Sequence, residues 1–251
     1  MIVSCVIPVW NCERYLAAAI DSVFNQTGVR EALEVVVVDD GSTDRTADVI
    51  ASFGSRVKTT RQENAGHGAA RNTGIRMASG EFIAFLDADD LWHPDKIRRQ
   101  LKTLWGGDAS PNLHNPRPVA LMAFTWLRNF EGEPPAWETA QSGDSVPAYS
   151  SVTALVHRSV FDTVGLFDAS LRHGGDRDFF MRAAERGIGK VMLDEVLVSR
   201  RLHESNRSRH LSANSRAEYL RILKASLDRR RQAGAVTDLD FSGHARDRGH
   251  A

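Results

Sequence analysis

Carboxylate side chains follow two short apolar runs of the sequence, at the point where each run ends. The first run covers residues 35–38 and the second covers residues 82–86. The acidic residues after these runs are Asp39, Asp40, Asp44, Asp87, Asp89 and Asp90. Like charges gathered in one place repel unless a cation or a hydrogen-bond donor compensates them. The alternate carboxylates of Asp87 and Asp89 are oxygen ligands of the kind that Mg²⁺ or Mn²⁺ prefers, and such cations keep part of their shell for substrate phosphates.

Helix capping is the simpler interpretation of the same residues. Asp40, Ser42 and Asp44 precede a predicted helix, and Asp and Ser are good N-caps. Capping would explain one of these carboxylates, but it would not explain the other five that follow the two strands. An isolated Asp-x-Asp tripeptide arises often by chance, so it is the position of Asp87 and Asp89 at a strand end that favours a metal site.

Apolar, β-branched runs alternate with helical patterns through the first hundred residues, which predicts parallel strands joined by right-handed helical crossovers. We expect strands at residues 2–7, 35–38, 57–60 and 82–86, and helices near residues 16–24, 43–53, 69–78 and from residue 93 onward. Four successive valines at residues 35–38 indicate a strand buried on both faces. Ligands of an open α/β sheet bind outside the carboxyl ends of its strands, where the acidic residues and residues 8–11 collect.

In the second half of the chain, the predicted strands and helices are separated by longer irregular segments. We expect strands at residues 119–126, 151–157 and 190–198, a short helix ending at Gly165, and helices near residues 176–186 and 216–231. Residues 106–118 and 131–150 are predicted to be loops, and loops of this length are typical of lids or binding segments. The last helix is expected to use Tyr219, Leu220, Leu223 and Leu227 as its apolar face.

The composition is that of a globular protein, with 251 residues, 42% apolar and 25% charged. The formal net charge is zero, but residues 1–199 carry 20 basic and 26 acidic side chains, whereas residues 200–251 carry 12 and 6. An acidic body argues against a nucleic-acid-binding protein, which needs excess cations. Cys5 and Cys12 lack the partners of a zinc site, and Cys5 is expected to be buried. The sequence shows neither a signal peptide nor a membrane span, so we expect a cytoplasmic protein.

Six segments together resemble the family 2 glycosyltransferases of the GT-A fold. They are Val6-Ile7-Pro8-Val9-Trp10-Asn11, Val37-Val38-Asp39-Asp40-Gly41-Ser42-Thr43-Asp44, Asn64-Ala65-Gly66 with Ala70-Arg71-Asn72-Thr73-Gly74-Ile75, Gly80-Glu81-Phe82-Ile83-Ala84-Phe85-Leu86-Asp87-Ala88-Asp89-Asp90, Val164-Gly165-Leu166-Phe167-Asp168 and Asp176-Arg177-Asp178. The resemblance is dense over residues 2–95 and extends over roughly the first 200 residues. It implies inverting transfer of a sugar from a nucleotide-diphospho-sugar, most often a uridine one, to a hydroxyl of a glycan, a lipid-linked acceptor or a small molecule.

The resemblance also implies the domain organisation. A single α/β GT-A domain, with a Rossmann-like mixed sheet flanked by helices, is expected over residues 1–210. Residues 1–105 would form its nucleotide-binding half and residues 106–210 its acceptor-binding half. A C-terminal amphipathic helix at residues 211–234 and a flexible tail at residues 235–251 are expected to follow.

Residue roles follow from the resemblance one position at a time. Pro8 and Val9 are expected to line the base pocket, Asn11 to lie in the same donor site, and Asp39 to accept a hydrogen bond from the pyrimidine ring. Asp40 is expected to support the loop or the ribose.

Further positions are implied at the diphosphate and the metal, and these are Gly66, Arg71, Asp87, Ala88, Asp89 and His203. Arg71, or a backbone group near Gly66, would lie along the diphosphate, with a structural ion pair as the alternative for Arg71. Asp89 is the expected ligand of Mn²⁺ or Mg²⁺, with Asp87 contributing to the ribose or the metal. His203 matches a position where many members place a histidine that closes over the metal.

Inversion in a single displacement needs one base, because the acceptor hydroxyl loses its proton as it attacks. Asp176 matches the position of the family's catalytic Asp, while Gly175 stands where the family usually has a Glu thought to contact the acceptor. The alternative is that Asp176 is an N-cap, with Asp178 a first-turn carboxylate that interacts favourably with the helix dipole.

Three other function classes compete with glycosyl transfer. A nucleotidyltransferase would release pyrophosphate, but its usual Gly-rich loop is missing from residues 8–11. A non-catalytic nucleotide-sugar binding module would bind a donor without turnover. A dinucleotide oxidoreductase would need a Gly-x-Gly-x-x-Gly motif after the first strand.

The basic C-terminal part has two interpretations. Arg200, Arg201, Arg207 and Arg209 flank His203 and could meet a diphosphate. The last helix, which ends in arginines at residues 229–231, either docks on the core or holds the protein against an anionic membrane at its inner face.

Overall fold

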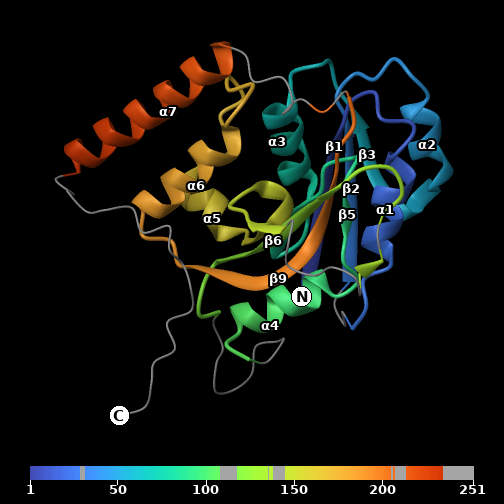
Figure 1. Cartoon of the computed structure of the whole chain (residues 1–251), viewed down its shortest axis with the longest axis horizontal. Helices are drawn as coiled ribbons and strands as arrows, with labels where there is room; N and C mark the ends of the chain where they lie inside the picture. The colour runs from blue at the N-terminus through green and yellow to red at the C-terminus, as the bar shows by residue number, and fades with distance from the viewer. Residues whose placement is uncertain are drawn as a thin grey trace.

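The structure is a computed structural model that describes residues 1–28, 32–107, 118–134, 136–137, 145–204, 206 and 213–233. Within these ranges nine strands form one mixed sheet in the order β3-β2-β1-β4-β8-β6-β9-β5, with β7 paired to β6. Helices cover both sides of this sheet (Figure 1). The predicted α/β class is therefore confirmed.

The first half of the chain forms the parallel part of the sheet, as predicted. The elements are β1 (Ile2–Val9), α1 (Leu16–Phe24), β2 (Ala32–Asp39), α2 (Thr46–Ser52), the 3-10 turn η1 (Gly54–Arg56), β3 (Val57–Arg61), α3 (His67–Met77) and β4 (Phe82–Phe85). Strand β1 lies between β2 and β4 and is parallel to both. Each expected strand and helix of this half is present, with ends that differ by a few residues.

The second half adds antiparallel pairs and one parallel pair, β6 with β9, to the sheet. Its elements are β5 (Leu91–Trp92), α4 (Lys96–Leu104), β6 (Met122–Phe130), β7 (Ser145–Pro147), the 3-10 turn η3 (Ser151–Thr153), β8 (Leu155–His157), α5 (Ser159–Val164), α6 (Gly175–Glu185), β9 (Lys190–Arg201) and α7 (Ala213–Gln232). Strand β8 pairs antiparallel with both β4 and β6. The change of strand direction therefore begins at β8.

Three details of this half differ from the predictions. Strand β5 was not expected, because two residues that pair with β9 leave no periodic pattern. Strand β7 lies inside the expected loop 131–150, and residues 151–153 form a 3-10 turn instead of the start of a strand. Much of the expected loops, the flexible tail at residues 235–251, and Arg207 and Arg209 lie outside the described residues.

The core consists of two apolar layers, one on each face of the sheet. In β2, Val35 and Val37 pack into one layer, whereas Val36 and Val38 pack into the other. Helices α1, α2 and α4 contribute to the first layer, and α3, α5 and α6 contribute to the second (Figure 1). Burial of β2 on both faces is as the valine run predicts.

Helix α3 packs so closely on β1 that one of its positions has no room for a side chain. A Cβ atom at Gly74 would lie 2.2 Å from Cγ1 of Val6. This contact explains a glycine inside a helix, where glycine is otherwise unfavourable.

Three of the four residues predicted for the apolar face of α7 share one face, but this face does not pack on the core. Leu220, Leu223 and Leu227 are exposed, whereas Tyr219 and Ile222 pack against Met181 of α6 and Leu171, which precedes α6. Polar contacts decide the orientation. The Glu185 carboxylate of α6 accepts hydrogen bonds from Ser226 and Arg229 of α7.

A lysine lies inside the first apolar layer. Lys96 at the start of α4 is fully buried, with its Nζ 2.8 Å from Oε1 of Gln100 and 4.3 Å from the ring centroid of Trp92. Burial lowers the pKa of Lys96 to about 7, because the interior disfavours the charged amine. At neutral pH this side chain is therefore close to losing its charge.

We predict that Lys96→Met raises the free energy of unfolding near pH 7, and that this gain shrinks toward pH 10. In the unfolded chain lysine titrates near pH 10.4, so between pH 7 and 10 the unfolded state of the wild type binds more protons than the folded state. Wild-type stability should then rise with pH by up to about 1.4 kcal/mol per pH unit from this group. Urea unfolding of both proteins between pH 6 and 10 measures the difference.

Lys102→Met on the exposed face of the same helix is the matched control and should show no such trend. A stability difference for Lys96→Met that stays constant over this pH range would contradict the prediction.

Candidate active site

The carboxyl ends of three parallel strands form one edge of the sheet, which we call the rim. Val9 at the end of β1 is in register with Asp39 at the end of β2, and Val6 is in register with Phe85 at the end of β4. The acidic segments that follow β2 and β4 therefore lie on either side of the segment that follows β1. The expected convergence of these strand ends is thus a consequence of the parallel pairing.

Asp40 organises the loop before α3. Its carboxylate is buried and accepts hydrogen bonds from Nε2 of Gln62 and from the backbone N–H groups of Ala65 and Gly66. Gly66 has a φ of 89°, a left-handed conformation that glycine adopts without strain. Asp40 therefore holds the loop that leads into α3.

Asn11 links the ends of β1 and β2 through hydrogen bonds. Its backbone N–H donates to Oγ of Ser42, and its Oδ1 accepts from the backbone N–H of Thr43. Asp39 is 2% exposed, and its Oδ1 accepts from the backbone N–H of Ser42 at 2.8 Å. Asn11 has a φ of 48°, so this junction depends on one strained residue.

Other residues expected at the donor site lie in the same part of the rim. Pro8 and Val9 are buried at the end of β1, with Val9 2% exposed. The carbonyl of Ala88 accepts a hydrogen bond from Sγ of Cys12 at 3.5 Å. These contacts attach the segment after β4 to the segment after β1.

Arg71 connects the rim to α6. From the middle of α3, its Nη2 lies 2.9 Å from Oδ1 of Asp87 and its Nη1 lies 2.9 Å from Oδ1 of Asp176. Burial lowers the pKa of Arg71, but the two carboxylates outweigh it and raise the pKa above its ordinary value. A charged guanidinium therefore bridges one carboxylate of the rim and one of α6.

Asp176 is held from a second side. Its Oδ2 accepts hydrogen bonds from the backbone N–H of Ser151 at 2.8 Å and from Oγ of Ser151 at 2.9 Å. Helix α6 begins at Gly175, and no side-chain cap is made at its N-terminus. The N-cap alternative for Asp176 is thus not what the structure shows.

Asp89 makes contact with the segment that follows β9. Its Oδ2 lies 2.9 Å from Nε2 of His203 and 3.2 Å from Nδ2 of Asn206. The ring of Tyr15 stacks on His203 with 5.1 Å between ring centroids. A carboxylate oxygen and an imidazole nitrogen are thus brought together from segments 114 residues apart.

The three carboxylates after β4 differ in their pKa values. Burial raises the pKa of Asp87, but Arg71 outweighs it, with His67 and Arg200 assisting, and the pKa lies below its ordinary value. Burial and then the charge of Asp87 raise the pKa of Asp89, although His203 opposes this. The pKa of Asp90 lies well above its ordinary value because of burial and of Asp89 and Asp87.

Burial and mutual repulsion therefore both disfavour the charged forms of Asp89 and Asp90. A divalent cation near Asp89 would offset both effects, and the oxygen and nitrogen atoms of Asp89 and His203 suit Mg²⁺ or Mn²⁺. No group of three His, Cys, Asp or Glu side chains gathers at metal-binding spacing among the described residues. Asp87 faces Arg71, so its expected place at the ribose or the metal stays a prediction.

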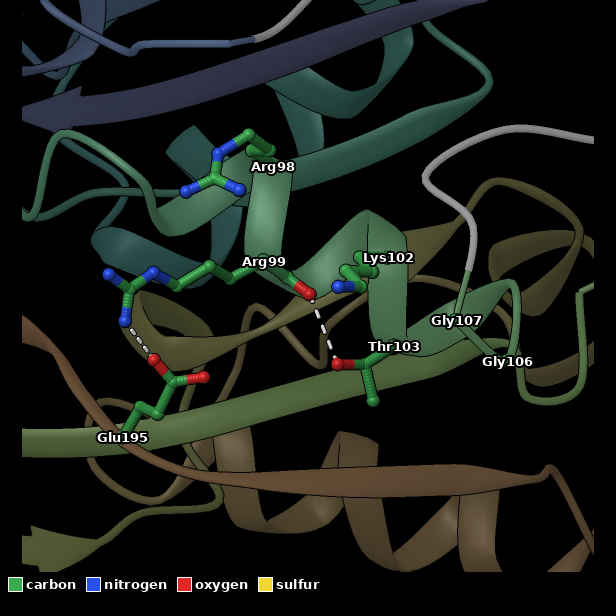
Figure 2. A pocket seen from close by; sticks show the side chains of 7 residues that line it. All are labelled: Arg98, Arg99, Lys102, Thr103, Gly106, Gly107 and Glu195. Carbon is green, nitrogen blue, oxygen red and sulfur yellow. Dashed lines mark hydrogen bonds and ion pairs between the residues drawn. The ribbon is translucent and has the colours of Figure 1, made fainter.

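A separate open cavity of about 580 Å³ lies away from the rim. It is lined by Arg98, Arg99, Lys102, Thr103, Gly106, Gly107 and Glu195, and Figure 2 shows Arg99 directed to Glu195. None of the rim carboxylates contributes to this cavity. It is therefore not the expected donor site.

Four residues near the predicted site were not identified from the sequence. Ser151, Tyr15, Asn206 and His67 contact or influence Asp176, His203, Asp89 and Asp87 respectively. Ser151 and Tyr15 lie in segments without a motif, so only the fold reveals them. His67 directly follows Gly66 in a segment that resembles the family, and that position was the available signal.

Comparison with known proteins identifies the family. The sequence model described as "Glycosyl transferase family 2" matches residues 4–165, which include the rim and both strands β4 and β8. The chain belongs to glycosyl transferase family 2.

Relatives and solved structures agree with this assignment. An uncharacterized glycosyltransferase of Rickettsia typhi is 29% identical over 230 residues, which cover 87% of this chain and 69% of the relative. TarS 1–349 of S. aureus, solved in complex with UDP, has a TM-score of 0.68 and 20% identity, with 95% of this chain and 67% of that chain covered.

A second solved structure is that of the mannosyltransferase PcManGT from Pyrobaculum calidifontis in complex with GDP-Man and Mn²⁺. It has a TM-score of 0.58 and 19% identity, with 93% of this chain and 76% of that chain covered. This family 2 chain therefore has the GT-A fold, as the sequence resemblance implies. No helix among its described residues is both long and apolar enough to cross a bilayer.

We predict that Arg71→Lys lowers the free energy of unfolding by about 1–3 kcal/mol, because one ammonium cannot bond Asp87 and Asp176 together as the planar guanidinium does. Arg76→Lys, on the exposed side of the same helix, is the matched control and should change stability by less than about 0.5 kcal/mol. Urea unfolding at pH 7 measures both. Equal effects of the two substitutions on the free energy of unfolding would show that the Arg71 bridge does not stabilise the fold.

Proposed function

We propose that this family 2 glycosyltransferase transfers a sugar from a nucleotide-diphospho-sugar to an acceptor hydroxyl, with inversion and with a divalent metal ion. The observation that carries the proposal is the Arg71 bridge, which holds Asp176 of α6 beside Asp87 of the rim. A candidate base and a candidate donor site are thereby joined through one side chain. The donor site would bind the nucleotide-diphospho-sugar, and the base would accept the proton of the acceptor hydroxyl.

The rim is proposed to bind the donor, and a uridine nucleotide is the donor we favour. TarS was solved with UDP and PcManGT with GDP-Man and Mn²⁺. In this chain Pro8 and Val9 would line the base pocket, with Asn11 beside them, and Asp39 would accept a hydrogen bond from the base. Oδ1 of Asp39 already accepts one bond from Ser42, and a carboxylate has further lone pairs for a second partner.

The diphosphate is proposed to lie near Arg71 and the backbone at Gly66 and Ala88. Both Nη atoms of Arg71 are paired with carboxylates, while its buried Nε has no hydrogen-bond partner among the described residues. A guanidinium has five N–H groups, so the second N–H of Nη1 or Nη2 could donate to a phosphate oxygen, whereas Nε is too deeply buried to reach one.

Asp89 and His203 would hold the metal, with Asp87 contributing to it or to the ribose. The ion would offset the negative charge that develops on the departing nucleotide diphosphate. The pKa of Asp89 is raised by burial and then by the charge of Asp87, and a cation beside Asp89 would offset both effects. Tyr15 and Asn206 would position His203 and Asp89 for this task.

Asp176 is proposed as the base. In one displacement the acceptor oxygen forms a bond to the anomeric carbon, the bond from that carbon to the diphosphate oxygen breaks, and the hydroxyl proton passes to Asp176. Inversion follows because attack and departure occur on opposite faces. Ser151 and Arg71 each occupy one carboxylate oxygen of Asp176, and each oxygen keeps a lone pair for the proton.

We predict that Asp176→Asn lowers kcat by about 10²–10⁴-fold, the usual contribution of a general base, and leaves donor binding unchanged. Ser151→Ala should lower kcat less, because the backbone N–H of residue 151 still orients the carboxylate. Release of nucleotide diphosphate from a panel of nucleotide sugars with Mn²⁺ and acceptor extracts measures turnover. Calorimetry measures donor binding.

Asp178→Asn is the control, because Asp178 lies in the same turn of α6 but pairs with Arg182. Asp178→Asn should lower the free energy of unfolding and leave kcat unchanged. Wild-type kcat in Asp176→Asn would remove this residue as base. Release of pyrophosphate instead of nucleotide diphosphate would indicate a nucleotidyltransferase, and donor binding without turnover on any acceptor would indicate a binding module.

A further inference from the structure

Helix α7 is held to the body by its inner face. Ile222 and Ser226 are buried on this face, with 4% and 1% of their surfaces exposed. Glu218 accepts hydrogen bonds from the backbone N–H groups of Arg172 and His173, and Glu185 accepts bonds from Ser226 and Arg229. These contacts fix the rotation of the helix, so its outer face cannot turn inward.

The outer face of α7 is apolar along its middle. Leu220, Leu223 and Leu227 are 68%, 51% and 48% exposed. Their spacing of three and four residues places them in one row along a helix. Figure 1 shows α7 at the edge of the molecule, with α6 on one side only.

Cations surround this row of leucines. Arg216, Lys224 and Arg231 are exposed, and each lies four residues from Leu220 or Leu227, on the same side of the helix. Over its whole length α7 has six basic and two acidic residues. Glu218 and Arg229 belong to the inner face, and the other acidic residue, Asp228, lies 3.9 Å from Arg231. The outer face thus combines leucines with an excess of positive charge.

We propose that the outer face of α7 binds the surface of an anionic lipid bilayer. A helix that lies in a membrane interface buries an apolar row at the boundary of the acyl chains and keeps cations at the headgroup level. Each Lys or Arg near an anionic surface adds attraction that salt screens. The outer face has both components, and they lie on the same side.

Charge argues against a second copy of the chain as the occupant. In an antiparallel pair of α7 helices, Arg216 of one copy would approach Arg231 of the other, and in a parallel pair each cation would meet its equivalent. Three leucines also fall short of the ~800 Å² that each partner of a stable interface buries. An anionic surface meets no such repulsion.

Membrane contact through this face would bring the candidate base close to the bilayer. A Cβ atom at Gly174 would lie 2.8 Å from Cε1 of Tyr219, so the start of α6 touches the inner face of α7. Asp176 is the second residue of α6. The lipid surface would then lie about one helix diameter, roughly 10 Å, from the beginning of α6.

Sedimentation of the full chain with vesicles tests the proposal. We expect binding to phosphatidylcholine vesicles that contain about one third phosphatidylglycerol, weak binding to phosphatidylcholine alone, and loss of binding as salt is raised. The combined variant Leu220→Gln, Leu223→Gln, Leu227→Gln should bind at least tenfold more weakly. The combined variant Arg216→Gln, Lys224→Gln, Arg231→Gln should lose about fivefold for each cation removed.

Two matched variants serve as controls. Val119→Gln with Val146→Gln removes exposed apolar side chains elsewhere, and Arg45→Gln with Arg76→Gln and Lys102→Gln removes three exposed cations elsewhere. Both should bind like the wild type. Circular dichroism and Tm should be unchanged in all variants, because every substituted side chain is exposed.

Three results would overturn the proposal. These are no binding of the wild type to the anionic vesicles, equal binding of the leucine variant and the wild type, and a wild-type dimer in light scattering that the leucine variant dissociates. The last would assign the face to a second copy. The measurement reads lipid binding without turnover, so its outcome is independent of the proposed glycosyl transfer.

Discussion

Compensation of negative charge at one edge of the sheet is the constraint on which the site depends. Parallel pairing of β1, β2 and β4 brings several carboxylates together, and such a group is stable only with positive charge nearby. Arg71 supplies one charge, at Asp87 and Asp176. The pKa values of Asp89 and Asp90 are still raised, first by burial and then by their carboxylate neighbours. A divalent metal ion at the rim would relieve this repulsion and would offset the charge of a donor diphosphate.

The bridge also links the two halves of the chain that would supply the donor site and the base of the proposed reaction. Arg71 comes from α3 in the parallel half, whereas Asp176 and Ser151 come from the second half, where strand pairing is mixed. A change in either half would alter the position of the candidate base relative to the rim. Because a guanidinium has donors in a fixed plane, it sets the relative positions of Asp87 and Asp176 in a way that a lysine does not.

The sequence predicted the parallel half of the fold well, since each β-branched run and each helical stripe there is local. It also predicted that the acidic segments after β2 and β4 lie at the same edge of the sheet, because the ends of parallel strands share an edge. It did not predict Ser151 or Tyr15, whose roles depend on contacts between segments far apart in the chain. For α7 the spacing of Leu220, Leu223 and Leu227 was read correctly as one face, but the hydrogen bonds of Glu218 and Glu185 turn that face outward. Polar contacts of this kind leave no periodic signal.

Binding of UDP with and without Mn²⁺ tests the central claim about the rim most directly. We predict that calorimetry will show UDP bound at least tenfold more tightly with Mn²⁺ than with a chelator, and that Asp89→Asn will lose this difference while keeping its Tm. Equal affinity for UDP in the presence and absence of Mn²⁺, or an unchanged effect of Mn²⁺ in Asp89→Asn, would contradict a metal-assisted donor site at this edge of the sheet.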